Sequence, residues 1–217
     1  MDPTTSSTHV PSLTHLRDFA RARAAGRRTH VAQDKAQVKA PKNDRFFGFA
    51  YERFLSSTIA YVGAGRRSDA LERAHETASP RMAASYRAAA KGMGTILEEL
   101  DAVAARRRQR NVVVTDPDSG DALVSLRLHL LLESPRGRAV AAHLYFSDRA
   151  LAPAELRVVE TAIALAVRQA APSFSPAVAL VRTGALAMVN AEAMNAERVE
   201  ALRAVSSEYQ DAWDAEG

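Results

Sequence analysis

Residues 111–147 restrict the fold more than any other part of the chain. From residue 122 to residue 132 every second position is apolar, and the intervening positions include Arg127 and His129. This period of two is typical of a β-strand with one buried face. On either side, the segments DPDSG and SPRG combine the Pro, Asx and Gly residues that favour tight turns. The stretch therefore predicts a three-stranded β-meander.

The second turn of this meander would bring two histidines together. In a regular hairpin, His129 lies opposite or nearly opposite His143 on the same face. Two imidazoles on adjacent strands can bind zinc, and Asp121 or Glu133 would be the third ligand. Histidines on the polar face of a strand more often make hydrogen bonds at or near the surface. We therefore expect no metal and no cofactor here, although a divalent metal is the alternative.

Helical periodicity and capping residues predict most of the remaining elements. Gly92 and Gly94 interrupt the longest helix and indicate a bend or a close contact with the sheet. Aromatic residues gather in the helix before it, where helical spacing favours a core position over base stacking. The expected elements outside the meander are a disordered segment 1–12, a short basic helix 13–28, a flexible basic linker 27–43, an aromatic helix starting at Asn43 or Asp44 and stopping at Gly63, a short helix 66–77, a long helix 80–108, a helix 153–170, an apolar strand 177–182 and a last helix 186–213.

These elements predict an α+β fold. Its core would be a mixed four-stranded sheet that carries the long helix and the helix beginning at Pro153. The expected organisation is a basic arm (1–43), a helical N-terminal region (44–78), an α+β core domain (79–183) and a C-terminal helix (184–217). The apolar stripe of the last helix needs a partner surface, either the helical N-terminal half or a second copy of the chain.

Charge is distributed unevenly along the chain. The net charge is +4, but residues 1–110 carry +9 and residues 111–217 carry −5. This asymmetry predicts either a side that faces a polyanion or two halves that attract each other. The abundance of Arg and Ala is also typical of a GC-rich genome, so the number of arginines says little by itself.

The densest basic cluster follows the predicted long helix, with four arginines in residues 106–110. Cations there complement the C-terminal end of the helix dipole, but four exceed what that role requires. Together with the basic arm, this cluster is the candidate contact surface for nucleic-acid phosphates. The candidate residues are Arg106, Arg107, Arg108, Arg110, Arg27, Arg28, Lys35, Lys39 and Lys42.

Several kinds of site are not found in the sequence. The chain has no cysteine, which excludes disulfides and thiolate metal sites. It has no apolar run long enough to span a membrane and no secretory signal at its start, so we expect a cytoplasmic location. No Gly-rich phosphate loop and no sequence signature of a hydrolase is present.

The predicted order of a long helix, three meandering strands, a helix and a strand resembles the core of the PD-(D/E)XK nuclease-like superfamily. The resemblance covers roughly residues 80–182 and is topological. It implies a carboxylate near the second strand, a position that Asp121 can fill, and a Glu-x-Lys motif on the third strand. The chain offers Ala141, Ala142 and His143 at that motif. The resemblance thus implies a core that has lost its metal site.

We therefore expect a non-enzymatic binding protein that contacts nucleic acid through its basic half. A structural protein that oligomerises or binds a protein partner through its C-terminal helix is the alternative. A divergent metal-dependent hydrolase using Asp121, Arg127, His129 and His143 is the third hypothesis.

Overall fold

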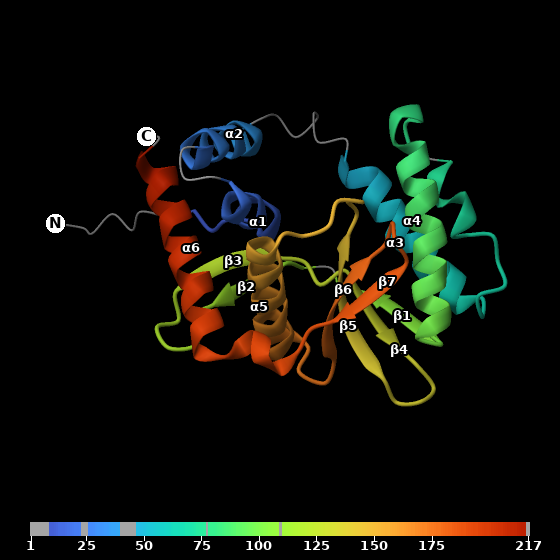
Figure 1. Cartoon of the computed structure of the whole chain (residues 1–217). Helices are drawn as coiled ribbons and strands as arrows, with labels where there is room; N and C mark the ends of the chain where they lie inside the picture. The colour runs from blue at the N-terminus through green and yellow to red at the C-terminus, as the bar shows by residue number, and fades with distance from the viewer. Residues whose placement is uncertain (1–8, 23–25, 40–46, 77, 109, 216–217) are drawn as a thin grey trace.

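The computed structural model describes residues 9–22, 26–39, 47–76, 78–108 and 110–215, without the side chains of residues 47–50. In these ranges the chain forms an α+β fold with a C-terminal helix, as predicted (Figure 1). The helices are α1 (Leu13–Arg21), α2 (Arg27–Lys39), α3 (Phe47–Gly63), α4 (Pro80–Glu99), α5 (Pro153–Ala170) and α6 (Ala196–Ala215), with short 3₁₀ helices η3 (Glu72–His75) and η4 (Ala191–Met194). The strands are β1 (Ala104–Arg107), β2 (Val112–Thr115), β3 (Ala122–Leu126), β4 (Leu130–Glu133), β5 (Ala139–Tyr145), β6 (Ser175–Leu180) and β7 (Ala185–Met188).

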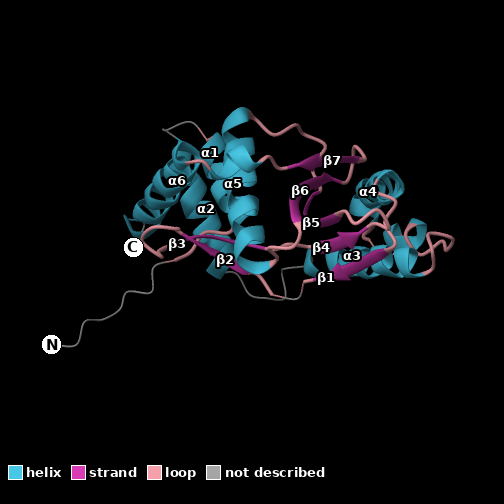
Figure 2. Ribbon diagram, turned by 90° about the horizontal axis from the view of Figure 1, so that it is seen from below, coloured by secondary structure: helices cyan, strands magenta, loops and turns pink. Residues whose placement is uncertain are grey.

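A five-stranded sheet in the order β1-β4-β5-β6-β7 forms the middle layer. Adjacent strands in this sheet are antiparallel, except that β5 and β6 are parallel and are connected through α5. Helix α5 covers one face of this sheet, and α3 and α4 cover the other (Figure 2). The fourth strand of the prediction is therefore confirmed as β6, in the parallel position that its apolar run favours.

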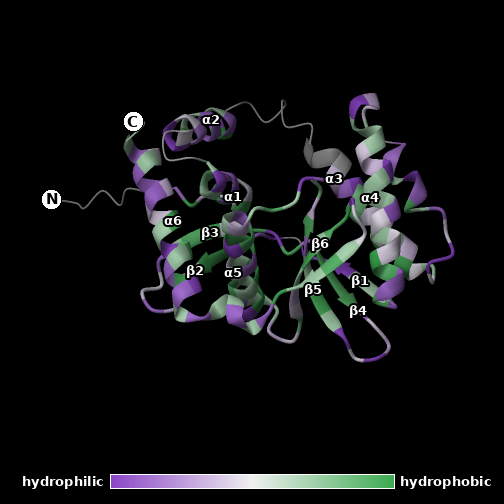
Figure 3. Ribbon diagram, viewed as in Figure 1, coloured by the Kyte–Doolittle hydropathy of each residue, from purple (hydrophilic) through white to green (hydrophobic). Residues whose placement is uncertain are grey.

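Two hydrophobic cores lie on the two faces of the sheet. On the α3–α4 face, Phe54, Met93 and Ile96 pack against the even-numbered residues of β4 and β5. On the other face, α5 packs with α1, α6 and the separate β2–β3 hairpin. Hydrophobic residues accordingly predominate along the central strands, whereas hydrophilic residues are frequent in α2 and α6 (Figure 3). The hairpin thus belongs to the second core and not to the sheet.

The single strand predicted over residues 122–132 is in fact two strands. Strand β3 ends at Leu126, and β4 begins at Leu130 in a different sheet. The alternation continues across the break because Val124, Leu126 and Leu128 are buried in the α5 core, whereas Leu130 and Leu132 are buried in the α4 core. One alternating run of apolar residues therefore continues through two strands that belong to different sheets.

The prediction of one helix from residue 80 to residue 108 is wrong beyond Glu99. Asp101 adopts a left-handed backbone conformation (φ 53°), which ends the helix. Residues 104–107 then form β1, an edge strand that pairs with β4. Alanine and arginine favour helices in isolation, but pairing with β4 overrides that preference.

Three other predicted segments differ from the structure. The flexible linker is wrong for residues 27–39, which form α2, while residues 40–43 lie outside the described chain together with the predicted cap of the aromatic helix. The last helix begins at Ala196, because β7 and η4 precede it. The short helix predicted over 66–77 is reduced to η3.

Gly92 confirms the predicted close contact between the long helix and the sheet. A Cβ atom at this position would lie 2.1 Å from the carbonyl oxygen of Val181 and 2.8 Å from the amide nitrogen of Gly184. Helix α4 therefore touches the β6–β7 turn backbone to backbone. At Gly94 the nearest atom to such a Cβ would be the Leu71 Cδ2, at 4.0 Å.

None of the helices in the described ranges is long and apolar enough to cross a membrane.

Candidate functional site

Most of the predicted nucleic-acid contacts bind partners within the chain. Arg106 pairs with Glu133, and Arg107 pairs with Glu52 at 2.9 Å. The Arg108 guanidinium donates to the Ala170 carbonyl oxygen at 2.8 Å, at the end of α5. Three of the four clustered arginines therefore hold β1 and the following loop against the rest of the fold.

The basic arm is engaged in the same way. Arg27 pairs with Glu208 at 2.5 Å and lies over the Phe19 ring. Lys35 donates to the Trp213 carbonyl oxygen and lies over the Trp213 ring. These contacts join α2 to α6, so the two oppositely charged halves do attract each other at this point. Lys42 lies outside the described residues, and the candidates left exposed with no partner in the described chain are Arg28, Lys39 and Arg110.

The C-terminal helix packs onto this N-terminal layer. Its apolar stripe, including Val199, Leu202 and Tyr209, is buried in the core that α1 and α5 share. The Tyr209 hydroxyl donates to the buried carboxylate of Asp34 in α2 at 3.1 Å. The stripe therefore has its partner within this chain, which removes the reason for expecting oligomerisation through it.

The predicted histidine pair exists. The register of β4 and β5 places Leu130 opposite Ala142, and the rings of His129 and His143 follow at a centroid distance of 4.6 Å. Tyr51 of α3 packs edge-on against His129, with 5.1 Å between the ring centroids. The pair thus lies where the chain passes from one sheet to the other, beneath α3.

Burial holds both histidines in the neutral form. Removal from water lowers the pKa of His129 well below its usual value, and the neighbouring His143 and Arg127 lower it further. Burial also lowers the pKa of His143 to about 4, although its hydrogen bond to the Arg127 carbonyl oxygen opposes that shift. Neither ring is set to exchange protons near neutral pH, as a general base would.

The hydrogen bonds of the two rings determine their tautomers. His129 Nδ1 accepts the amide proton of Leu144 at 2.8 Å, so the proton of the neutral ring is on Nε2. His143 Nδ1 donates to the Arg127 carbonyl oxygen at 2.9 Å, which leaves a lone pair on its Nε2. Only one of the two rings therefore has a free lone pair, and the pair does not provide two imidazole ligands for a metal.

Asp121 lies far from the histidines in the fold. It follows the β2–β3 turn, accepts a hydrogen bond from Ser119, and lines a pocket beside Arg203 of α6. Arg127 is near the histidine pair, but its guanidinium is bound to Glu52 at 2.5 Å. The four residues of the hydrolase hypothesis are therefore not brought into one site. Within the described ranges, no group of three or more His, Cys, Asp or Glu residues is arranged to hold a metal ion.

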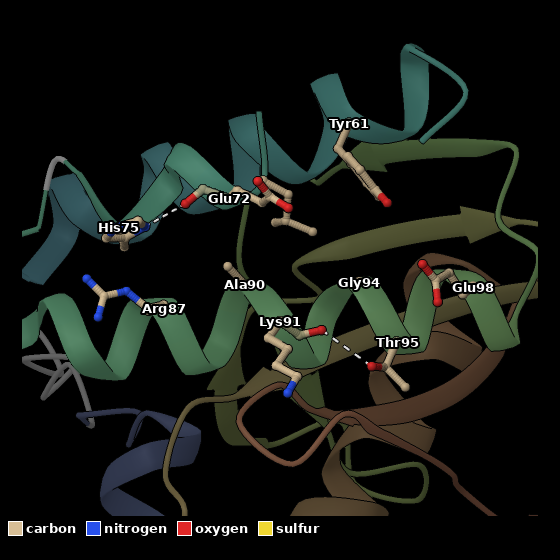
Figure 4. A pocket seen from close by; sticks show the side chains of 10 residues that line it. Tyr61, Glu72, His75, Arg87, Ala90, Lys91, Gly94, Thr95 and Glu98 are labelled. Carbon is tan, nitrogen blue, oxygen red and sulfur yellow. Dashed lines mark hydrogen bonds between the residues drawn. The ribbon is translucent and has the colours of Figure 1, made fainter. Parts of the chain in front are cut away.

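A cavity of about 580 Å³ lies elsewhere, as a groove between α4 and the α3–η3 layer. Figure 4 shows Arg87 and His75 facing each other near one end, and Tyr61 and Glu98 near the other. Ala90, Gly94 and Leu71 line the middle of the groove. We call this cavity the α4 groove.

Charged side chains line the α4 groove without neutralising one another. In the described chain, Arg87, Lys91 and Glu98 are exposed and make no side-chain hydrogen bond or ion pair, whereas His75 Nδ1 contacts the Glu72 carbonyl oxygen. Helix α4 also has no acidic residue in its first turn, no basic residue in its last turn, and two glutamates at its C-terminal end. This order opposes the helix dipole, so helix stability does not explain it.

The predictions from the sequence do not include the α4 groove. Arg87, Lys91 and Glu98 recur on one face of the predicted helix, with Gly94 between them, and that pattern was the available signal. The opposite wall comes from η3 and the end of α3, whose approach to α4 depends on tertiary packing. The charges alone resembled an ordinary solvated helix face.

Comparison of the chain with protein families, with curated proteins and with solved structures found no match.

Proposed function

We propose that this chain is a non-enzymatic binding protein and that its ligand lies in the α4 groove. The observation that carries the proposal is a cavity of about 580 Å³ lined by charged side chains that lack partners in the described chain. Ligand pockets typically enclose about 300–1,000 Å³ and contain a few convergent polar groups. The two histidines, by contrast, are held in the neutral form, and both rings are hydrogen-bonded within the chain.

The proposed function can be tested by blocking the groove. Gly94→Leu places a side chain into open space, because only Leu71 lies within 4.0 Å of the new Cβ. Ala84→Leu is the matched control, on an exposed position of α4 that does not line the cavity. Thermal stability would be measured with inorganic phosphate, nucleotides, free amino acids, short peptides and single- and double-stranded oligonucleotides.

At least one of these probes should raise the Tm of the unmodified protein and of Ala84→Leu, and fail to raise that of Gly94→Leu. If no probe class raises the Tm, or if Gly94→Leu responds like the unmodified protein, the groove is not the binding site.

Nucleic-acid binding is the second candidate, and the exposed side chains of Arg28, Lys39 and Arg110 favour it. Such binding would be electrostatic and would weaken steeply with salt. Replacing these three residues with glutamine should abolish it, whereas replacing Arg106 should not, because that side chain is paired with Glu133. Retention of DNA and RNA binding by the triple variant across a salt series would contradict this candidate. A cytoplasmic location is the setting that we propose for either function.

The resemblance to the PD-(D/E)XK nuclease-like core remains a proposal. Supporting it, the chain contains in this order a helix (α4), three antiparallel strands of one sheet (β1, β4 and β5), a helix (α5) and a parallel strand (β6), with the β2–β3 hairpin inserted between β1 and β4. The hairpin that precedes β4, with Asp121 at its turn, lies outside that sheet. The position of Asp121 therefore gives no support to a metal-dependent nuclease.

A further inference from the structure

The charges of the α4 groove are arranged by sign along its length. Arg87 and the half-buried His75 lie at one end, and Glu98 lies at the other, beside the Tyr61 hydroxyl (Figure 4). Lys91 and Glu72, of opposite sign, line the stretch between them. The groove is therefore complementary to a ligand with an anionic group at one end and a cationic group at the other.

The separation of these ends limits the size of the ligand. Arg87 and Glu98 are about three turns apart on α4, which corresponds to about 16 Å along the helix axis. A free amino acid is too short to reach both ends. An extended peptide rises about 3.3 Å per residue, so a segment of about five residues spans this distance.

The wall between the two ends suits a peptide backbone. Leu71, Ala90 and Gly94 present small or apolar surface, and the Tyr61 and Thr95 side chains provide hydroxyl groups at the Glu98 end. The Thr95 hydroxyl interacts with the Lys91 carbonyl oxygen at 3.4 Å, a long contact that a ligand could replace. Main-chain amides of an extended peptide could bond to these hydroxyls without requiring a particular side chain.

We infer that the α4 groove binds an extended peptide segment with an acidic residue at the Arg87 end and a basic residue about four positions away at the Glu98 end. This inference rests on the proposed function, because it assumes that the groove is the binding site. It adds the class of ligand, its length and its direction of charge.

The test uses four capped pentapeptides that differ only at their ends: acetyl-Glu-Ser-Ala-Ser-Lys-amide, and the versions with Glu at both ends, Lys at both ends or Ser at both ends. Affinity for the full chain would be measured by NMR titration at low salt. The Glu…Lys peptide should bind about fivefold more tightly than either like-charged peptide, since one exposed ion pair contributes up to about that factor. The dipeptide acetyl-Glu-Lys-amide should bind more weakly, because it cannot reach both ends.

Charge reversal at each end gives the decisive result. Arg87→Glu should make the peptide with two lysines the preferred ligand, and Glu98→Arg should make the peptide with two glutamates preferred. Arg81→Glu is the matched control, because Arg81 is an exposed residue of α4 that does not line the groove, and it should keep the original preference.

Equal binding of all four peptides, equal binding of the dipeptide, or preferences that do not follow the reversed charges would overturn the inference. If no peptide binds, but another probe class raises the Tm in the groove-blocking experiment, only the peptide assignment fails. If neither experiment detects a ligand, the proposed function fails as well.

Discussion

Backbone atoms of α4 and of the β6–β7 turn meet at Gly92, with no side chain between them. The gap is too small for one methyl group, since its carbon would lie 2.1 Å from the Val181 carbonyl oxygen. Two residues further on, Gly94 faces the open groove. Neighbouring glycines in the same helix therefore have opposite requirements, one for close approach and one for open space.

Alanine substitutions should separate these two roles. Gly92→Ala should lower the free energy of unfolding by about 3 kcal/mol or more, because backbone must move to admit the methyl group. Gly94→Ala should raise it by about 0.5–1 kcal/mol, because alanine favours the helix and meets nothing closer than 4.0 Å. Urea unfolding of both variants measures the difference. Equal effects of the two substitutions would contradict the contact at Gly92.

The histidine pair should make the protein sensitive to mild acid. Its folded-state pKa values lie below the ordinary value of 6.5, so the unfolded chain binds more protons as the pH falls. Stability contributed by His143 is therefore present above pH 6.5 and is lost as the pH falls toward about 4. Each unit of pKa difference corresponds to about 1.4 kcal/mol.

Thermal unfolding between pH 8 and pH 4 tests this prediction. His143→Gln should flatten the dependence below pH 6.5, while its amide can still donate to the Arg127 carbonyl oxygen. An unchanged slope in the variant would show that His143 does not titrate in this way. Carboxylates with lowered pKa values, such as Asp116 and Glu155, lose their stabilising charge at lower pH and can be distinguished by that window.

At the scale of elements, the start of α5 depends on the buried carboxylate of Glu155 and on its main partner, the partly exposed Arg149. The Glu155 side chain is inaccessible to solvent, accepts two hydrogen bonds from Arg149 at 2.6 and 2.8 Å, and also accepts the amide proton of Ala152. A carboxylate in this position completes the first turn of the helix. Without its partner, the same charge would be costly to bury.

Glu155→Gln should lower the free energy of unfolding by about 1–3 kcal/mol, because the amide cannot satisfy Arg149 and Ala152 equally well. Arg149→Met alone should cost at least as much, because it removes the main partner of a buried charge. The double variant Glu155→Gln/Arg149→Met should lose less than the sum of the two single losses, because no unpaired charge is left buried. Denaturant unfolding of this double-mutant cycle gives the coupling, and strictly additive losses would show that the pair contributes nothing.

Local sequence patterns predicted the elements whose ends are marked by proline or turn residues, or whose apolar residues are regularly spaced. Pro80 and Pro153 marked the starts of α4 and α5, and the turns around Pro117 and Pro135 were placed correctly. The register that joins His129 and His143 followed from alternation and one turn. Edge strand β1 gave no such signal, because Ala-Ala-Arg-Arg becomes a strand only beside β4. Helix α2 was missed because it buries only Val31 and Asp34, too few to produce a stripe.

The candidate site was less predictable than the fold. A groove has two walls, and the sequence pattern indicated only one of them, the charged face of α4. The sequence shows where the basic residues are, but whether an arginine is free depends on the position of a distant carboxylate. Glu52, for example, lies in a different element from Arg107 and Arg127, the two arginines that it binds.

At the scale of the whole molecule, opposite charges on the two halves of the chain meet in several places. Arg27 with Glu208, Arg106 with Glu133 and Glu52 with Arg127 each join a residue before position 111 to one after it. Exposed pairs of this kind contribute only a few tenths of a kcal/mol to about 1 kcal/mol each, and salt screens them.

Thermal stability should therefore fall slightly as salt increases. Between about 10 mM and 500 mM NaCl, we expect the Tm to drop by about 2–4 °C, the shift that about 1 kcal/mol produces in a chain of this size. Glu208→Gln should reduce the drop by removing the partner of Arg27. A Tm that rises steadily with salt would show that repulsion outweighs these pairs.

The packing of α6 on α1 and α2 has a consequence for how the chain folds during its synthesis on the ribosome. Helices α1 and α2 are made first, but the surface that buries Phe19 and Asp34 includes Tyr209, which is made near the end. Until α6 emerges, the part of α1 and α2 that α6 covers stays exposed to water, and it is open to chaperones or to other nascent chains. The α3–α4 core closes earlier, because its last contributor is the β6–β7 region. The two hydrophobic cores on the faces of the sheet are therefore completed at different times. The first helices to be synthesised, α1 and α2, are among the last to be fully packed.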